Sequence, residues 1–469
     1  MESAAIPTAI AFIEKYIPEA MRDAKTPGCS LALVRGGEIV YESGFGWRDL
    51  ERSLPATPDT LCGIGSCSKA VAATAILLLE EQHALSLDDP IDRYVPFKLR
   101  SPRGPITIHH FLTHSSGLPA LSTSEILIQK GLGVDRGFPL ASSEDFYRWV
   151  NGAQGEMTAE LGERFFYCNE GYRMLGHIVQ TVAGMPFHDV VAERILKPLG
   201  MRRSSYVRSV FEQDPDHMQP YLTKPDGSIA AAPFPYPDVA ANTDISFMLA
   251  AGGLVASVHE MTRFLASNFA ASPTRLLSAT SLARMRQSYL TKSMSPYGPT
   301  GYGYGWTVTE NFLGVPMIAH GGSIDVATAY TAFLPREELG AVIVANASGM
   351  PHATIIEGIF AALLGHDPFK TIPSLVSTRR MRSFSGEYET YRGVNRARVF
   401  SKAGMLYLEQ KDDFQDTVVP LIPEDATMAS NRFYILTEGV RQLVVFEPTP
   451  EGFDIYIERN RFHKVRCAD

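Results

Sequence analysis

The sequence predicts an α+β domain followed by a small all-β module, and three observations support this. Apolar strand-like segments lie on both sides of a long helical middle in about the first 370 residues. From residue 371 onward, short β-rich stretches alternate with turn residues. The chain has 469 residues, of which 45% are hydrophobic, enough for two domains with cores of their own. We expect domains at 1–370 and 381–469, joined by a linker at 371–380.

The first domain is predicted to build one antiparallel sheet from both of its ends. An amphipathic segment at 10–21 predicts a helix, and strands at 30–34 and 38–41 flank an Arg-Gly-Gly turn at 35–37. The strands that return after the helical middle are expected at 302–309, 315–319, 328–334 and 340–346.

The middle of the first domain, about 66–270, is predicted to be a mostly helical insert. Ser257 and Glu260 have the spacing of a capping box that opens a helix through Phe264. Residues 120–160 are rich in glycine, serine and charge, which predicts a variable loop region beside the site. A plain surface loop explains that composition equally well.

The C-terminal module is predicted to be a barrel of about eight strands. Its β-rich stretches are short and separated by turn residues, a spacing that fits a small up-and-down barrel resembling lipocalins. The expected strands are 386–390, 396–401, 405–409, 416–421, 432–436, 441–446, 452–457 and 460–465.

Ser66 and Lys69 form the motif with the clearest chemical meaning. Lys69 is the only lysine with a serine three positions before it, and it precedes the apolar run 70–79. Residues i and i+3 share a helix face, so the hydroxyl and the amine are expected to enter one cavity. A buried lysine with a lowered pKa can take the proton of a serine nucleophile.

Two further motifs follow in order: Tyr167-Cys168-Asn169 and His320-Gly321-Gly322. The order Ser-x-x-Lys, Tyr-x-Asn, His-x-Gly resembles the serine beta-lactamase and penicillin-binding protein superfamily, in its class C-like (peptidase S12-type) branch. The resemblance covers about residues 8–370. Supporting segments are Leu87-Asp-Asp-Pro90, Leu112-Thr-His-Ser-Ser-Gly-Leu-Pro119, Ala251-Gly-Gly-Leu254 and Gly303-Tyr-Gly-Trp306.

The resemblance implies a role for each catalytic residue. Ser66 would attack a carbonyl carbon and form an acyl-enzyme, with Lys69 and Tyr167 as the pair that handles protons. Either member of the pair could be the base, and their titrations are expected to be coupled. Asn169 would hold the substrate amide.

The His-x-Gly strand is predicted to bind substrate through His320, Gly321 and Gly322. By resemblance, the oxyanion hole consists of the backbone N–H groups of Ser66 and Ser323. The superfamily's K-[ST]-G motif, which helps to hold a substrate carboxylate, is missing from this sequence. Its absence favours aminopeptidase, amidase or esterase chemistry over D-Ala-D-Ala carboxypeptidase or efficient beta-lactamase activity.

Three functions remain open from the sequence. The preferred one is a serine peptidase or amidase for substrates with D-residues or an N-terminal aminoacyl group. The alternatives are a carboxylesterase with weak beta-lactamase activity and a penicillin-binding sensor without turnover. The intact Lys69, Tyr167 and Asn169 speak against a silent sensor. An archaeal self-compartmentalising D-peptidase and related D-aminopeptidases share this domain arrangement; there the extra domains restrict access or support assembly, which is compatible with a homo-oligomer.

Composition narrows the partners and the setting. A net charge of −8 and a pI near 5.9 argue against nucleic acid or an anionic membrane. The five cysteines are unpatterned, no secretory signal is recognised, and the run 70–79 is too short to span a bilayer. We therefore expect a cytoplasmic protein that acts on a small peptide, amide or ester.

No cofactor is predicted, and neither is a metal site. His109, His110 and His114 lack a carboxylate at zinc-site spacing, and His114 lies inside a family signature. Cys67 and Cys168 occupy variable motif positions and are expected to be small buried residues rather than nucleophiles.

Overall fold

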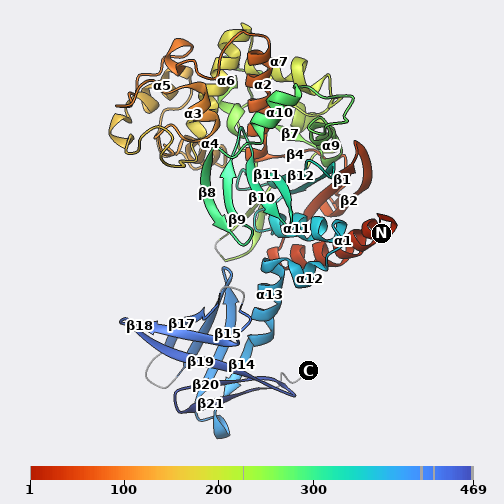
Figure 1. The fold of residues 1–469 in the computed structure, drawn as a ribbon, viewed down its shortest axis with the longest axis vertical. Helices are drawn as coiled ribbons and strands as arrows, with labels where there is room; N and C mark the ends of the chain where they lie inside the picture. The colour runs from red at the N-terminus through yellow and green to blue at the C-terminus, as the bar shows by residue number, and fades with distance from the viewer. Residues whose placement is uncertain (1, 225, 412–415, 426–427, 466–469) are drawn as a thin grey trace. The chain divides into compact units, whose positions relative to one another are not determined.

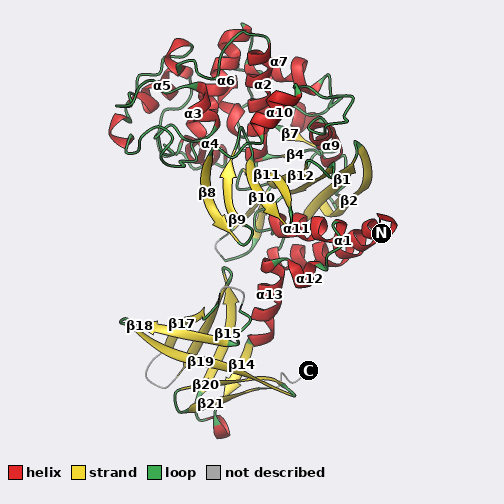
Figure 2. Ribbon diagram, viewed as in Figure 1, coloured by secondary structure: helices red, strands yellow, loops and turns green. Residues whose placement is uncertain are grey.

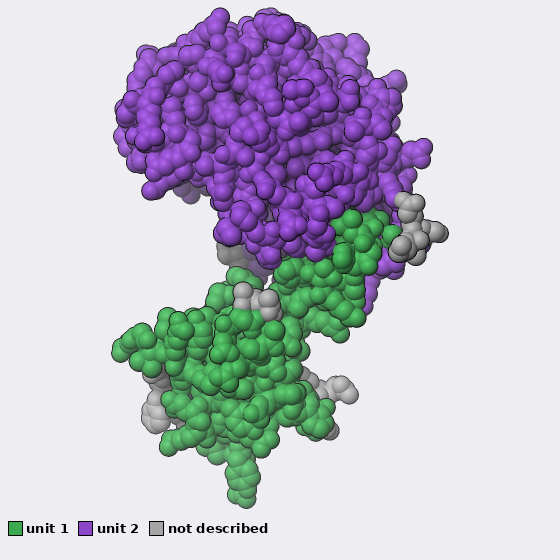
Figure 3. Space-filling model, in the orientation of Figure 1, with its two compact units in different colours: residues 1–5, 357–469 green, residues 6–356 purple. Residues whose placement is uncertain are grey.

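The computed structural model describes residues 2–224, 226–411, 416–425 and 428–465. The chain forms two compact units, one of Ile6–Ile356 and the other of Met1–Ala5 with Glu357–Asp469 (Figure 3). Within the described residues, every helix is too short or too polar to cross a membrane.

The larger unit contains the predicted antiparallel sheet (Figure 1). The two ends of the unit meet in its middle, where Cys29 of β1 pairs with Ala345 of β13. The sheet order is β3 (Leu54–Pro55), β2 (Glu38–Asp49), β1 (Gly28–Arg35), β13 (Leu339–Ala345), β12 (Thr328–Leu334), β11 (Val315–Ser323), β10 (Thr307–Phe312), β9 (Gly298–Tyr302), β8 (Leu290–Ser295). The α+β prediction is therefore confirmed.

One predicted strand of this sheet is wrong. Residues 302–309 are divided between β9 and β10, which pair with each other through Tyr302 and Thr307. The chain turns between them because the Gly303 N–H donates to the Trp306 carbonyl at 2.8 Å. Gly305 supplies a φ of +76°, which a residue with a side chain rarely adopts.

The helices form the other half of the larger unit, and α2 (Ser68–Glu81) runs through its core. The run 70–79 is apolar on all sides, and nearly every residue of α2 is buried, as expected for a central helix. α6 (Asn169–Ala183) packs against α2 and against the 3₁₀ helix η5 (Thr243–Ala251). The remaining α-helices up to residue 363 are α1 (Glu2–Ala24), α3 (Ile108–Leu112), α4 (Thr123–Gly131), α5 (Ser143–Asn151), α7 (Phe187–Val191), α8 (Arg208–Gln213), α9 (Val258–Ala266), α10 (Ala279–Met285) and α11 (His352–Leu363), the last of which has residues in both units.

The region 120–160 is more ordered than its composition predicts. It contains α4 and α5 instead of one long loop. The Ser142 side chain caps α5 by accepting a hydrogen bond from the Asp145 backbone N–H at 3.1 Å. The polar residues of this segment thus start a helix as well as facing solvent.

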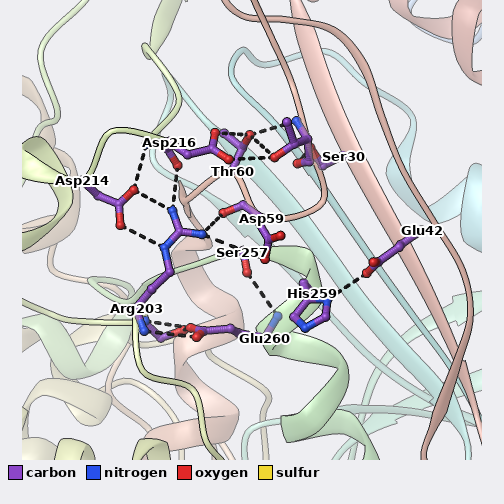
Figure 4. Close-up of polar contacts among 12 residues, drawn as sticks. Ser30, Glu42, Asp59, Thr60, Arg203, Asp214, Asp216, Ser257, His259 and Glu260 are labelled. Carbon is purple, nitrogen blue, oxygen red and sulfur yellow. Dashed lines mark hydrogen bonds and ion pairs between the residues drawn. The ribbon is translucent and has the colours of Figure 1, made fainter.

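Only half of the predicted capping box forms at the start of α9. Ser257 Oγ accepts from the Glu260 N–H at 3.1 Å, as predicted. The Glu260 carboxylate instead accepts from the backbone N–H groups of Arg203 and Ser204, at 3.1 and 2.8 Å (Figure 4). This glutamate therefore ties α9 to a distant segment of the chain.

The same polar network continues to Thr60, which precedes Ser66 in the sequence (Figure 4). Arg203 donates to both carboxylate oxygens of Asp214, at 2.6 and 2.9 Å. Asp216 accepts from the Thr60 hydroxyl at 2.6 Å. Thr60 leads directly into β4 (Cys62–Gly63), so these contacts fix the approach to the candidate site.

The smaller unit contains a closed eight-stranded antiparallel barrel, which confirms the second part of the fold prediction (Figure 2). Each strand lies close to its expected position. The strands are β14 (Gly386–Glu389), β15 (Arg396–Lys402), β16 (Met405–Lys411), β17 (Asp416–Pro423), β18 (Arg432–Thr437), β19 (Val440–Thr449), β20 (Gly452–Ile457) and β21 (Asn460–Lys464). Its likeness to lipocalins stays a prediction.

The residues expected to form a linker, 371–380, are largely helical. α12 (Pro368–Thr371) is followed by α13 (Pro373–Phe384), and each begins with proline, which favours the first turn of a helix. Phe384 at the end of α13 packs against Phe446, with ring centroids 4.5 Å apart. α13 therefore contributes to the barrel interior.

Candidate active site

Ser66 lies at the entrance to α2, in the short 3₁₀ turn Gly65–Cys67. Its Oγ is 3.0 Å from Nζ of Lys69, one turn further along. The two groups therefore meet as the i,i+3 spacing predicts. Lys69 is fully buried, so its amine reaches the serine from inside the core.

The Lys69 amine has two further partners. Nζ lies 2.7 Å from Oδ1 of Asn169 and 2.7 Å from the backbone oxygen of Ala251. It also lies 4.7 Å from the centroid of the Tyr167 ring. The Ala251 carbonyl is a contact that the sequence did not reveal, although the Ala251-Gly-Gly-Leu254 signature marked its position.

The ionisation of Lys69 and Tyr167 differs sharply. Burial first, and then the charge of Arg173, lower the pKa of Lys69, while Glu170 acts in the opposite direction, and the resulting pKa is about 7. Burial raises the pKa of Tyr167 well above its usual value, against a lowering effect of its hydrogen bond with Ser66. Near pH 7, Tyr167 is therefore a neutral phenol, whereas Lys69 is partly a free amine.

His114 holds the Tyr167 segment in place, a role that the sequence did not reveal. Its Nδ1 accepts a hydrogen bond from the Cys168 N–H at 3.0 Å, and its ring centroid lies 4.4 Å from that of Tyr167. Burial, followed by the charge of Lys69, lowers the pKa of His114 well below its usual value. His114 is therefore a neutral support for the tyrosine.

The other two histidines of this region have separate partners. His109 Nδ1 lies 2.9 Å from the Tyr304 hydroxyl. His110 Nδ1 lies 2.9 Å from the Thr107 hydroxyl. Each of the three histidines thus has its own local structural contact.

His320 lies on β11 with both ring nitrogens engaged. Nδ1 lies 2.7 Å from the Gly321 carbonyl, to which it must donate, so Nε2 accepts from the Tyr302 hydroxyl at 2.9 Å. Burial first, and then the charge of Lys69, lower the pKa of His320 to about 3. A neutral, hydrogen-bonded ring shapes the site and has little capacity to hold a substrate carboxylate.

Gly65 and Gly322 allow β11 to approach the serine turn closely. Gly65 has a φ of +53°, and a Cβ there would collide with the backbone nitrogen of Ser323. A Cβ at Gly322 would overlap the Ile64 carbonyl and lie 3.0 Å from the Ser66 nitrogen. The backbone nitrogens of Ser66 and Ser323 both border this contact, and their role as the oxyanion hole stays a prediction.

Gly321 and the two motif cysteines lie outside this contact. A Cβ at Gly321 would reach the Tyr330 ring at 3.4 Å, so this glycine leaves more room than Gly322. Cys67 Sγ donates to the His320 carbonyl at 3.2 Å, and burial raises the pKa of its thiol to about 12. Cys168 is also buried, with Sγ 3.4 Å from Oε2 of Glu170. Neither thiol resembles a reactive thiolate.

The fold and the cluster of Ser66, Lys69, Tyr167 and Asn169 define a protein of the serine beta-lactamase and penicillin-binding protein class. Residues 13–364 match the Beta-lactamase family, and the chain belongs to it. Residues 368–463 match the Pab87 octamerisation domain.

Three known proteins illustrate the similarity. The octameric penicillin-binding protein homologue from Pyrococcus abyssi is 33% identical, with a TM-score of 0.90 over 97% of this chain and 99% of that one. Protein flp from Staphylococcus aureus (strain MW2) is 23% identical over 78% of this chain and 68% of its own length. A D-amino acid amidase from Ochrobactrum anthropi SV3 shares the fold, at 22% identity and a TM-score of 0.60 over 77% of this chain and 99% of that one.

Proposed function

We propose that this protein is a serine hydrolase that forms an acyl-enzyme on Ser66 and acts as a peptidase or amidase. The observation that carries the proposal is the set of partners around the Lys69 amine. The oxygens of Asn169 and Ala251 only accept hydrogen bonds, and they occupy the two N–H groups of a neutral amine. The nitrogen lone pair is then left for the Ser66 hydroxyl, 3.0 Å away. This is the arrangement that a general base needs.

In the first half-reaction, Ser66 Oγ attacks the substrate carbonyl carbon and its proton passes to Lys69. The carbonyl oxygen becomes an oxyanion, which the N–H groups of Ser66 and Ser323 stabilise. When the tetrahedral intermediate collapses, the bond to the leaving group breaks. The Tyr167 phenol gives its proton to that group and is reprotonated by Lys69.

In the second half-reaction, water attacks the acyl carbon. The pair of Lys69 and Tyr167 takes one proton from the water, and Ser66 regains its own as the acid departs. This division of roles favours Lys69 as the base, because the raised pKa of Tyr167 disfavours a tyrosinate.

We propose peptides or amides that contain D-residues, or an N-terminal aminoacyl group, as substrates. The engaged ring of His320 and the missing K-[ST]-G motif leave a weak hold on a substrate carboxylate. The D-amino acid amidase that shares the fold supports the same substrate class. A cytoplasmic location remains a prediction from the sequence.

A substrate panel on the purified full-length protein tests this proposal. It comprises D- and L-aminoacyl p-nitroanilides, short-chain p-nitrophenyl esters and nitrocefin, with Ser66→Ala as the matched control. We expect turnover of D-aminoacyl amides that Ser66→Ala abolishes, and labelling of Ser66 by a fluorescent penicillin. Good ester turnover without any amide turnover would instead identify an esterase. Retained hydrolysis in Ser66→Ala would rule out the mechanism.

We also propose that the protein forms a homo-oligomer through its barrel. The octamerisation-domain match and the octameric homologue support self-association. The barrel has an outer apolar face across β17, β18 and β19, where Ile422 pairs with Tyr434 and Tyr434 pairs with Leu443. Val418 and Leu436 on the same face are 52% and 53% exposed. Arg441 also lies on this face, 4.7 Å over the Tyr434 ring, and exposed apolar side chains bordered by polar ones mark association surfaces.

A further inference from the structure

α6 carries two ionisable side chains directly behind the candidate site. Glu170 and Arg173 follow Asn169, and they are 0% and 1% exposed. Burying a charged side chain is costly unless hydrogen bonds and a counter-charge compensate it. The burial of two ionisable side chains three residues apart on one helix therefore indicates a role other than filling the core.

Arg173 is incompletely satisfied. Its Nη2 donates to the Ser124 hydroxyl at 3.1 Å. Its Nε and Nη1 are buried and have no hydrogen-bond partner among the described residues. Among the described residues, Arg173 thus donates to one neutral hydroxyl and to no carboxylate. Glu170 and Glu125 act on its charge only electrostatically, so the guanidinium also acts on other nearby groups through a medium of low polarity.

Glu170 is held firmly by a different element. Its Oε1 accepts from the Thr123 backbone N–H at 3.0 Å and from the Thr123 hydroxyl at 2.6 Å. Its Oε2 accepts from the Cys168 thiol at 3.4 Å. The start of α4 thus fixes the position of this carboxylate.

Both charges act on Lys69. α6 packs along α2, and Asn169, one helical turn before Arg173, contacts the Lys69 amine at 2.7 Å. Among the charged side chains, Arg173 has the largest effect on the pKa of Lys69, which it lowers, and Glu170 raises that pKa. The two residues therefore oppose each other across a short stretch of core.

We propose that Arg173 and Glu170 are positioning residues that set how much of the Lys69 amine is free to accept the Ser66 proton. Arg173 favours the free amine, and Glu170 limits this effect. The inference rests on the proposed function, since it needs Lys69 as the base. It assigns a role to two residues that make no contact with the reacting atoms.

The other titratable groups near Lys69 are neutral at pH 7, because burial raises the pKa of the thiols and phenols and lowers that of the imidazoles. A change of charge at Arg173 or Glu170 should therefore alter the pKa of Lys69 without a change in the ionisation of these groups. These groups are Cys67 in the serine turn, His114 after α3, Tyr167 and Cys168 before α6, Tyr172 on α6 and His320 on β11. Lys292 of β8 is a separate charged group, which lowers the pKa of His114 and of His320.

The test is the pH dependence of kcat/KM for the full-length protein and three variants of similar side-chain size. Arg173→Met should shift the acid limb of the pH profile to higher pH by about one unit. This shift lowers kcat/KM roughly tenfold at pH 6 and changes it little at pH 9. Glu170→Gln should shift the acid limb to lower pH. Arg173→Lys, which keeps the charge, should restore the wild-type limb. A purely structural role would not produce shifts of opposite sign.

Limbs that stay in place, or that move in the same direction in both variants, would overturn the inference while leaving the proposed function intact. Failure of the proposed function would look different, because the wild type would then lack Ser66-dependent turnover. The pH dependence of fluorescent-penicillin acylation is measured in parallel. If Arg173→Met does not fold, Glu170→Gln decides alone: a downward shift supports the inference, and an unmoved limb overturns it.

Discussion

The two units treat buried charge in opposite ways. The larger unit buries Lys69, Glu170 and Arg173 around its candidate site, and Arg173 keeps two nitrogens without hydrogen-bond partners among the described residues. The barrel interior is apolar and rich in aromatic rings. In the same unit, the buried carboxylate of Asp454 faces away from this core and has a direct ion pair with Arg461 at 2.7 Å.

This difference reflects the chemistry of the candidate site, which needs a buried ionisable group, whereas the barrel interior needs only apolar packing. A free amine near pH 7 requires a lysine that is removed from water, and that removal costs folding free energy. The barrel has no such requirement, so its interior is filled by side chains such as Phe433 and Phe446, with ring centroids 5.4 Å apart. The burial of Lys69 thus lowers the stability of the larger unit, and the barrel interior has no equivalent cost.

The strongest way to break this comparison is Lys69→Met. Activity should fall on the order of 10³–10⁴-fold, because the serine loses its base. The fold should become more stable below pH 7, because the removal of a buried charge outweighs the loss of the hydrogen bonds that Asn169 and Ala251 accept from the amine. Activity follows from the substrate panel, and stability from thermal unfolding.

The pH dependence of that stability has a definite sign. The folded-state pKa of Lys69, about 7, lies below the unfolded value of roughly 10.4. The burial penalty is therefore complete below pH 7 and disappears as the pH rises past about 10.4. Lys69→Met should stabilise the protein more at pH 6 than at pH 10. An equal effect at both pH values would contradict a neutral buried amine.

A cavity in the barrel should have the opposite consequence. Phe446→Ala removes a fully buried ring and should lower the free energy of unfolding of the smaller unit by about 3–5 kcal/mol. The acid limb of the pH–rate profile should stay in place, because the groups that act on Lys69 all belong to the larger unit. Calorimetry should show one of two transitions moving. A shifted acid limb would mean that packing in the barrel affects the ionisation of Lys69, and it would contradict the contrast between the two units.

Gly322→Ala should disturb the site through the backbone alone. The added methyl group overlaps the Ile64 carbonyl and forces β11 away from the serine turn. A displaced oxyanion-hole donor should lower kcat by about 10²-fold. Gly321→Ala is the matched comparison, since its methyl group meets only a tyrosine ring at 3.4 Å and should cost less than tenfold. Equal losses of kcat in both variants would show that activity does not depend on the close approach of Gly322 to the serine turn.

The smallest effect on chemistry is expected from the outer apolar face of the barrel. Leu436→Lys combined with Leu443→Lys places charge on two strands of that face and should dissociate the oligomer. Light scattering after size-exclusion chromatography measures the mass, and turnover per Ser66 should change less than threefold. Val394→Lys, at an exposed position in the turn between β14 and β15, is the control. An unchanged mass in the double variant would place the association surface elsewhere.

The barrel shows how far local patterns can go. Its eight strands were predictable because each is a short β-rich run that ends in turn residues, and strands in such a barrel pair mainly with their neighbours in sequence. The helices at 123–131 and 143–151 were missed, because serine and charged residues at helix starts look like loop composition. The split of 302–309 depended on one hydrogen bond across a glycine turn.

The site was predictable only in part. Ser66 and Lys69 share a helix face, so their meeting follows from a spacing of three residues. The Ala251 carbonyl, the His114 support and the engagement of the His320 ring did not follow, because each joins segments that are far apart in the sequence. The same holds for Arg173, which looks like an ordinary helix residue until its burial is known.

By itself, the sequence determined the fold class, the order of the strands along the chain and the residue types at the candidate site. These depend on periodicity, turn residues and motif spacing, which are local properties. Only the tertiary structure decided which groups surround the Lys69 amine and how its proton affinity is set. Burial and charge act through space, and the positions that share that space come together only when the chain is folded.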